Sequence, residues 1–187
     1  MALPRIFITG ITGMVGSHLA DYLLEKTDWE LYGLCRWRSP MDNLSHLVGR
    51  INDKDRLTLL YGDLRDTLSI REAVAKSRPN YVFHLAAQSF PRTSFDAPID
   101  TMTTRMFTHT GPRRGNVFAE STFAKQIAMI EKNFIPPVVK IGNLQSLRTI
   151  ADVRDAVRAY YMLVTVKPTT GAYYNIGGEH SCTVGTS

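Results

Sequence analysis

The chain has 187 residues, of which 44% are hydrophobic and 21% are charged. This length and composition fit one ordinary globular domain, or one domain plus a short appendage, and exclude a disordered or low-complexity chain. The formal net charge of +5 favours phosphate-rich ligands, while the scattered arginines and lysines argue against nucleic-acid binding.

The sequence also argues against several kinds of site and location. Its two cysteines, Cys35 and Cys182, show no metal-ligand spacing and suggest no disulfide framework, so we expect no metal site and a reducing, cytoplasmic location. The first residues lead directly into a strand-like run without the apolar region of a secretory signal. No apolar run is long enough to cross a bilayer, so we expect no membrane partner.

The first half of the chain alternates strand and helix patterns. Ile6–Ile8 is a short apolar run typical of a parallel strand buried on both faces, and the apolar spacing over Met14–Lys26 predicts an amphipathic helix. Further strands are predicted over Leu31–Cys35, Leu57–Tyr61 and Tyr81–Ala86. Another helix is predicted to begin after its N-cap, Asp66, and to end near Pro79. This alternation predicts an α/β fold with a Rossmann-type doubly wound parallel sheet.

The second half has weaker periodicity. Residues 90–105 are interpreted as a loop because they contain two prolines and several threonines without a clear period. Helices are predicted around Phe123 and Ile130 and again after Asp152. Strands are predicted over Val138–Ile141 and Tyr173–Ile176.

Three glycines follow the first predicted strand. Gly10, Gly13 and Gly16 have GxxGxxG spacing and precede the first predicted helix. Glycines in this position permit a tight turn, a close backbone approach to a diphosphate and close helix–sheet packing, while the helix start attracts anions. The arrangement predicts a dinucleotide-cofactor site; the alternative is a tight turn with only a structural role.

The end of the second strand bears on which cofactor is bound. The sequence there is Cys35-Arg36-Trp37-Arg38, with no carboxylate for a ribose 2′-hydroxyl and two arginines that suit a 2′-phosphate, which favours NADP. The alternative is a pair of solvated surface arginines. Asp63, after the third strand, is either an acceptor for the adenine amine or a turn-forming aspartate.

Three motifs together resemble the extended short-chain dehydrogenase/reductase superfamily. They are Thr9-Gly10-Ile11-Thr12-Gly13, Gly62-Asp63-Leu64 and His84-Leu85-Ala86-Ala87-Gln88-Ser89. Segments 107–115, 123–127, 142–144 and 152–155 resemble GDP-mannose 4,6-dehydratases and their sister reductases. The resemblance implies a homo-oligomeric enzyme that moves a hydride from C4 of a GDP-sugar to NADP, eliminates water across C5 and C6, and returns the hydride to C6.

The resemblance also implies site residues by matching position. The implied cofactor-binding residues are Gly10, Thr12, Gly13, Met14, Val15, Gly16, Arg36, Asp63, Leu64, Leu85, Ala86, Ala87, Ser89, His109 and Arg114. Lys125 and Arg148 are the implied contacts to the sugar nucleotide.

The catalytic residues are left unassigned. The family uses a Tyr, a Lys four residues later and a Ser or Thr, and its dehydratases add a Glu. The one Tyr–Lys pair with this spacing is Tyr22 and Lys26; we reject it because Tyr22 continues the apolar stripe of Val15 and Leu19.

The family's strand and helix for this catalytic set are missing near residues 101–105. The chain is therefore interpreted as an NADP-binding Rossmann half, residues 1–105, and a small, incomplete C-terminal substrate-binding portion, residues 106–187. Three functions are open: an NADP-dependent sugar-nucleotide dehydratase, a reductase or epimerase of the same superfamily, or a non-catalytic protein that binds NADP or nucleotides.

Overall fold

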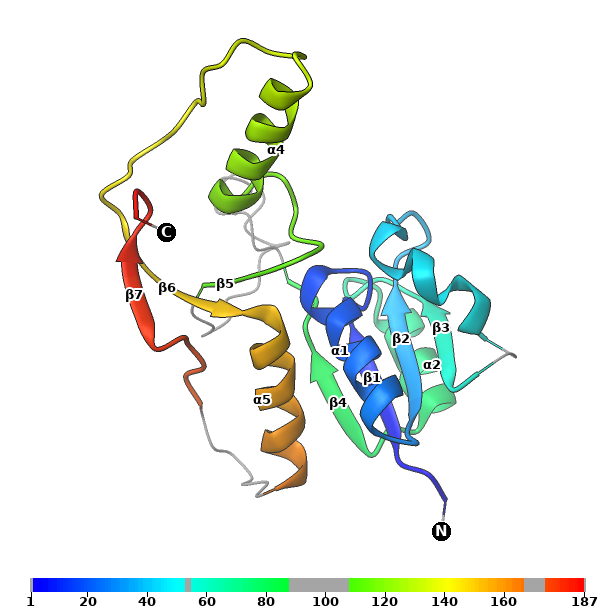
Figure 1. Ribbon diagram of the computed structural model, residues 1–187. Coiled ribbons are helices and arrows are strands. Elements are labelled where there is room, and N and C mark those ends of the chain that lie inside the picture. Colours follow the sequence, from blue (N-terminus) through cyan, green and yellow to red (C-terminus); the bar gives the residue numbers. More distant parts are fainter. Residues whose placement is uncertain (1, 53–54, 88–107, 167–173, 187) are drawn as a thin grey trace.

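The computed structural model describes residues 2–52, 55–87, 108–166 and 174–186. Four parallel strands form the first sheet, in the spatial order β3-β2-β1-β4 (Figure 1). They are β1 (Arg5–Thr9), β2 (Glu30–Cys35), β3 (Leu57–Tyr61) and β4 (Tyr81–His84). The helical elements that connect them are α1 (Met14–Lys26), the 3₁₀ helix η1 (Asp42–Arg50) and α2 (Thr67–Ser77). This strand order is that of a Rossmann-type half, and it confirms the predicted fold class.

The side chains of β1 explain why helices cover both faces of this sheet. Ile6 and Ile8 are buried in one apolar cluster with Leu19 of α1. Phe7, which lies between them, is buried in a second cluster with Ala73 of α2. Because successive side chains of a strand point to opposite faces, this apolar run needs one helix on each side of the sheet.

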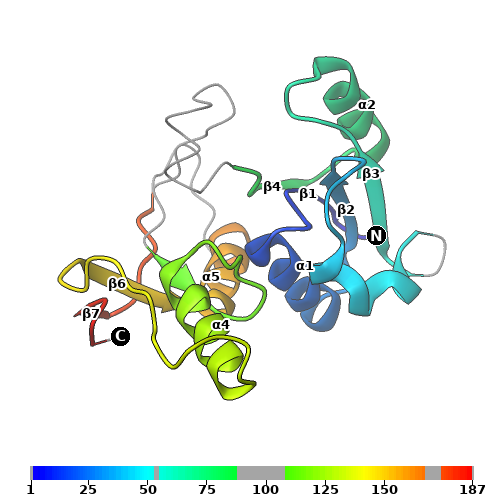
Figure 2. The same ribbon diagram turned by 90° about the horizontal axis from the view of Figure 1, so that it is seen from above.

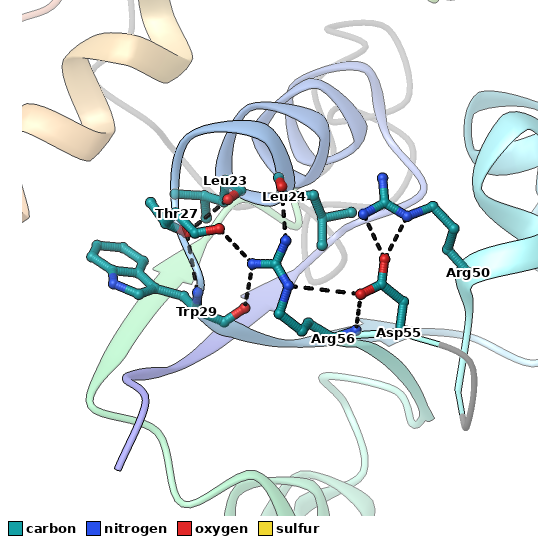
Figure 3. Close-up of polar contacts among 7 residues, drawn as sticks. All are labelled: Leu23, Leu24, Thr27, Trp29, Arg50, Asp55 and Arg56. Atoms are coloured by element: carbon teal, nitrogen blue, oxygen red, sulfur yellow. Dashed lines mark hydrogen bonds and ion pairs between the residues drawn. The ribbon is translucent and has the colours of Figure 1, made fainter. Parts of the chain in front are cut away.

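α1 ends at a group of backbone carbonyls to which Arg56 binds (Figure 3). The Arg56 guanidinium donates to the carbonyl of Leu24 at 2.9 Å and to that of Thr27 at 2.5 Å. Asp55 lies on the other side of the guanidinium, with 3.7 Å between Arg56 Nε and Asp55 Oδ1. A cation is favoured at the negative end of the helix dipole, so Arg56 fixes the end of α1 opposite the glycine turn.

α2 has the boundaries that the sequence predicts. The Asp66 side chain accepts a hydrogen bond from the backbone N–H of Leu68 at 3.0 Å, which confirms its role as the N-cap. The helix ends at Arg78, which has a left-handed φ of 42° immediately before Pro79. Proline cannot continue a helix, and the left-handed cap satisfies the last turn.

The sequence predicts no element between Cys35 and Leu57, where the structure has η1. The buried residues of η1 are Leu44 and Leu47. Their spacing of three matches the three residues per turn of a 3₁₀ helix. Two apolar residues are too few to give a periodic signal, so only packing against the core reveals this element.

A second, mixed sheet follows in the order β5-β6-β7. Its strands are β5 (His109–Thr110), β6 (Leu147–Asp152) and β7 (His180–Thr183), accompanied by the helices α4 (Ala119–Glu131) and α5 (Val153–Thr165). β5 and β6 are parallel, and β6 and β7 are antiparallel. Both helices were predicted, and Asp152 caps α5 by accepting the N–H of Arg154 at 2.8 Å.

Both strands predicted for this half were wrong, and β5, β6 and β7 were not predicted. Residues 138–141 are not a strand, and Val138 and Ile141 are exposed. The backbone N–H of Lys140 donates instead to the side chain of Gln126 at 2.7 Å. Residues 174–176 are not a strand either, and Tyr173 lies outside the described residues. Apolar runs predicted these strands, but a strand also needs a neighbour with which to pair.

α5 packs against α1, so the two portions of the chain share apolar contacts (Figure 2). Val157 is 1% exposed and belongs to the same cluster as the sheet residue Ile6. The Tyr161 ring lies 5.6 Å from that of Tyr22 and 5.5 Å from that of Trp29, between centroids. The predicted boundary at residue 105 falls outside the described residues and stays a prediction.

Candidate cofactor pocket

The predicted glycine turn joins the end of β1 to the start of α1. Gly10 has a φ of +70°, which L side chains rarely adopt, and a Cβ there would lie 2.8 Å from the backbone of Ala86. A Cβ on Gly16 would lie 2.3 Å from the carbonyl oxygen of Gly10. Gly13 is the N-cap of α1. The three glycines therefore lie at a helix start, in a turn too tight for side chains at positions 10 and 16.

The N-terminus of α1 is open to an anion. Gly13 makes no side-chain cap hydrogen bond, and the first turn of α1 has no acidic residue. An added Cβ at Gly13 would meet only the Gly10 carbonyl oxygen, at 3.2 Å, within 4 Å. The first N–H groups of a helix lack intrahelical acceptors, and the helix dipole adds positive potential. The open space at Gly13 therefore fits a phosphate group.

A cavity of about 500 Å³ lies beside this turn, at the carboxyl ends of the four parallel strands. This volume is in the range of cofactor and small-molecule sites. It brings together nine of the predicted residues: Gly10, Thr12, Gly13, Arg36, Asp63, Leu64, Leu85, Ala86 and Ala87. Leu34, Cys35, Ser39, Gly62 and Arg65 also line it and were not predicted as site residues. Arg65 and Ser39 lie within three residues of predicted positions, which is the only sequence signal for them.

Thr9 holds the segment after β4 against the glycine turn. Its side chain is buried at the end of β1, and its Oγ1 accepts the N–H groups of Leu85 at 3.1 Å and Ala86 at 3.2 Å. Thr9 Oγ1 also lies 2.9 Å from Nδ1 of His84. These bonds end β4 at His84, two residues before the predicted end, and they place Leu85 and Ala86 in the cavity wall.

Asp63 forms a local turn. Its Oδ1 accepts the backbone N–H of Arg65 at 3.0 Å, and its own N–H donates to Ser69 Oγ at 3.2 Å. The structure therefore bears out the interpretation of Asp63 as a turn-forming aspartate. The adenine contact stays a prediction, to which its position in the cavity wall is suited.

The residues after β2 form one rim of the cavity. Arg36 and Arg38 are both exposed, and Arg36 lines the cavity whereas Arg38 does not. The exposed Trp37 and Tyr61 rings contact each other edge to face, with 5.2 Å between their centroids. Burial raises the pKa of the neighbouring Cys35 thiol, so the cationic Arg36 has no thiolate beside it.

Eight predicted site residues are not among the described residues that line this cavity. Met14, Val15 and Gly16 begin α1, and their cofactor contacts stay predictions. The other five are His109, Arg114, Lys125, Arg148 and Ser89. Arg114 is largely buried, stacks on Phe118 at 4.1 Å and donates to the carbonyl of His109 on β5. Desolvation by burial lowers the pKa of Arg114. Lys125 on α4 and Arg148 on β6 are exposed. The fifth, Ser89, lies outside the described residues. The roles of these five residues stay predictions.

Residues 7–106 and 99–186 match the model of the GDP-mannose 4,6 dehydratase family. The chain belongs to this family. A GDP-mannose 4,6 dehydratase from Drosophila melanogaster is 39% identical over 93 residues, which are 48% of this chain and 23% of that protein. One from Vibrio cholerae is 41% identical over 95 residues, 49% of this chain and 25% of that protein. The matches thus span about a quarter of the length of these dehydratases.

The fold of this GDP-mannose 4,6 dehydratase family member is similar to those of two solved structures. A dTDP-glucose 4,6-dehydratase from Bacillus anthracis in complex with NAD superposes with a TM-score of 0.74 at 13% identity, covering 97% of this chain and 77% of that one. A UDP-glucuronic acid 4-epimerase from Bacillus cereus superposes with a TM-score of 0.76 at 19% identity, covering 96% and 79%. These likenesses confirm the Rossmann-type α/β fold.

The rejected Tyr–Lys pair lies away from the cavity. Tyr22 packs on the ring of Tyr161, and Lys26 donates to Glu25 at 2.6 Å at the last residue of α1. Neither residue lines the cavity at the other end of the helix. The structure therefore supports the interpretation that Tyr22 is a packing residue.

The described residues hold neither a metal-binding cluster nor a membrane-spanning helix. No group of three or more His, Cys, Asp and Glu residues is placed to hold a metal ion in this part of the chain. No helix among the same residues is long and apolar enough to cross a membrane.

Proposed function

We propose that this member of the GDP-mannose 4,6 dehydratase family binds NADP(H) in the cavity beside Gly13. The observation that carries the proposal is the uncapped start of α1, which faces open space at Gly13 and adjoins a cavity of about 500 Å³. An anion is favoured at such a helix start, and crevices at the carboxyl ends of parallel strands are where α/β sheets bind ligands. The NAD bound by the B. anthracis structural neighbour is consistent with this class of cofactor.

Arg36 supports NADP over NAD. It follows β2 directly and lines the cavity, where a guanidinium would bind a 2′-phosphate with charge-assisted hydrogen bonds. Among the residues that line the cavity, Asp63 is the one acidic side chain, and its Oδ1 already accepts the N–H of Arg65. No second carboxylate is therefore available there for a ribose 2′-hydroxyl.

The family supports a sugar-nucleotide dehydratase as the reaction. A bound NADP would accept the hydride from C4 of a GDP-sugar and return it to C6 after loss of water. This proposal assigns Lys125 and Arg148 to the sugar nucleotide and His109 and Arg114 to cofactor contacts, and it includes assembly of a homo-oligomer. The reductase and epimerase reactions of the same superfamily are alternatives within this fold.

A second candidate function is NADP binding without turnover. The observation that favours it is the position of Tyr22 and Lys26, the single Tyr-x-x-x-Lys pair of the sequence, which lies away from the cavity. Mixing the protein with NADP and GDP-mannose separates the candidates. A product that has lost one water, detected by mass spectrometry, supports the dehydratase, and cofactor binding without any product supports the binding protein.

The cofactor proposal is tested by Gly13→Asp. A carboxylate at this position would stand against the phosphates, so we expect NADPH affinity to fall by about 100-fold or more, as for like charges in contact. Fluorescence titration with NADPH measures the dissociation constant.

Gly49→Asp is the matched control for this substitution. Gly49 is exposed on η1, and an added Cβ there meets no atom within 4 Å. We expect this variant to bind NADPH like the wild type. Undiminished NADPH affinity in a folded Gly13→Asp variant would refute the proposed site.

A further inference from the structure

Asn43, on η1, contacts the glycine turn from outside the cavity. Its Nδ2 donates a hydrogen bond to the backbone carbonyl oxygen of Thr12 at 2.9 Å, and the contact is partly buried. Thr12 lines the cavity, whereas Asn43 does not. The two residues are 31 positions apart in sequence. The bond therefore links the unpredicted 3₁₀ helix to the turn on which cofactor binding depends.

This bond completes the hydrogen bonding of one peptide unit. The N–H of the Thr12–Gly13 peptide belongs to Gly13 and donates to the carbonyl oxygen of Gly10 at 3.0 Å. The carbonyl of the same peptide accepts from Asn43. A peptide held at both ends cannot rotate without breaking two hydrogen bonds.

The orientation of this peptide matters for an anion. Its carbonyl oxygen carries a partial negative charge and is directed to Asn43, a side chain that is not part of the cavity wall. A rotated peptide would present this oxygen to a diphosphate and repel it. The peptides that follow begin α1 and supply the N–H groups that attract the anion.

Asn43 is itself held in a fixed position by its neighbours on η1. Leu44 is 0% exposed and Leu47 is 4% exposed, and both lie in the main apolar cluster with residues of α1 and β1. The N–H of Leu44 donates to the carbonyl of Met41 at 2.9 Å. The position also selects an amide, because an aspartate of the same shape has no donor for the Thr12 carbonyl at neutral pH.

We propose that Asn43 is a positioning residue for the diphosphate-binding turn. It keeps the Thr12 carbonyl turned away from the cofactor and so leaves the start of α1 free to bind the two bridging phosphates. This role rests on the proposed binding of NADP(H).

The test compares two ligands in Asn43→Ala and Asn43→Asp. NADPH carries the diphosphate, whereas adenosine 2′-monophosphate has the adenine and 2′-phosphate but no 5′-phosphates. We expect Asn43→Ala to weaken NADPH binding about 10-fold, the equivalent of one hydrogen bond, and Asn43→Asp to weaken it further. Adenosine 2′-monophosphate should keep its affinity within about twofold, because a single phosphate at Arg36 does not contact the turn.

Ser45→Ala is the matched control. Ser45 lies on the same 3₁₀ helix, is exposed, and donates only to the local carbonyl of Asp42 at 2.9 Å. Its removal should leave the affinities for both ligands unchanged. Thermal unfolding of each variant, followed by circular dichroism, establishes that the titrated proteins are folded.

The outcomes separate this proposal from the one on which it depends. An equal loss of affinity for both ligands would assign Asn43 a merely structural role and overturn the inference. Unchanged NADPH affinity in folded Asn43→Ala would do the same. A wild-type protein that binds neither ligand would refute the proposed function itself, and the positioning role with it.

Discussion

Positions 16 and 33 require glycine because neighbouring atoms leave no room for a Cβ, and not because of a positive φ. A Cβ on Gly16 would collide with the Gly10 carbonyl oxygen, and a Cβ on Gly33 in β2 would lie 2.3 Å from Cδ1 of Ile11. Ile11 belongs to the glycine turn and is completely buried. The missing side chain at Gly33 therefore makes room for the residue that anchors the turn to the sheet.

Arg36 should decide the choice between NADP and NAD. We expect the wild type to bind NADPH more tightly than NADH. Arg36→Ala should weaken NADPH binding by about 10- to 100-fold, the range for charge-assisted hydrogen bonds, and leave NADH affinity nearly unchanged. Titration of both reduced cofactors by fluorescence measures this difference.

Arg38→Ala provides the matched control for Arg36. The two arginines are two positions apart and both are exposed, but Arg38 does not line the cavity. Its removal should change neither affinity by more than about twofold, since a solvated charge away from the ligand is screened by salt. Equal weakening of NADPH and NADH in Arg36→Ala would contradict the assignment of this residue to the 2′-phosphate.

At the scale of elements, the two ends of α1 differ in how their backbone hydrogen-bonding groups are satisfied. Its first turn carries no acidic residue and no side-chain cap, which leaves its N–H groups for an anion. Its last turn is satisfied by Arg56, which comes from the chain just before β3 and binds the carbonyls of Leu24 and Thr27 (Figure 3). The hydrogen bonds of Arg56 at the C-terminal end of α1 thus offset the cost of leaving the N–H groups at its start without a side-chain cap.

Arg56→Met should therefore lower the stability of the fold. Methionine keeps much of the side-chain length but donates no hydrogen bond, so the Leu24 and Thr27 carbonyls lose a charged donor. We expect the free energy of unfolding to fall by about 1–3 kcal/mol. Urea denaturation followed by circular dichroism measures this change.

Arg158→Met is a suitable comparison for this loss. Arg158 lies on α5 with a side chain that is 62% exposed, and it pairs with the equally exposed Asp155. Surface ion pairs contribute little to stability, so we expect a change below about 0.5 kcal/mol. Similar values for the two variants would show that the Arg56 cap does not stabilise α1.

At the scale of the whole molecule, the contact between α5 and α1 joins two portions of unequal size. Val153, Ala156 and Val157 are the buried residues of α5, whereas α4 has none. The second portion therefore has little apolar core of its own in the described residues and depends on the first portion for burial. The cavity, in contrast, is lined only by residues between Gly10 and Ala87.

Tyr161→Ala tests this dependence. The ring fills the space between Tyr22 and Trp29, and its removal leaves a void between α5 and α1. We expect the protein to lose about 2–4 kcal/mol of stability, slightly less than for a fully buried aromatic residue. Chemical denaturation measures the loss, and NADPH affinity of the folded variant should stay unchanged.

Tyr174→Ala controls for the loss of any tyrosine. Tyr174 is 47% exposed, and we expect its replacement to change stability by less than about 0.5 kcal/mol. A large fall in NADPH affinity for folded Tyr161→Ala would instead mean that the second portion supports the cavity.

Local patterns in the sequence determined most of the first portion. The apolar run Ile6–Ile8, the spacing of the glycines after it, and the cap at Asp66 are each recognisable from a short stretch of sequence, so they could be predicted without the fold. Nine of the predicted cofactor residues meet in one cavity because parallel strands bring their carboxyl ends together.

Only the tertiary structure decided the contacts between segments distant in sequence. The bonds from Asn43 to Thr12 and from Arg56 to α1 join residues about 30 positions apart, and no periodic signal marks such pairs. The incorrect strand at Val138–Ile141 has the same cause, since strand formation depends on a partner that a local apolar run does not specify. Sequence patterns thus predicted the α-helices and strands of the first sheet, whereas contacts between distant segments were decided by packing.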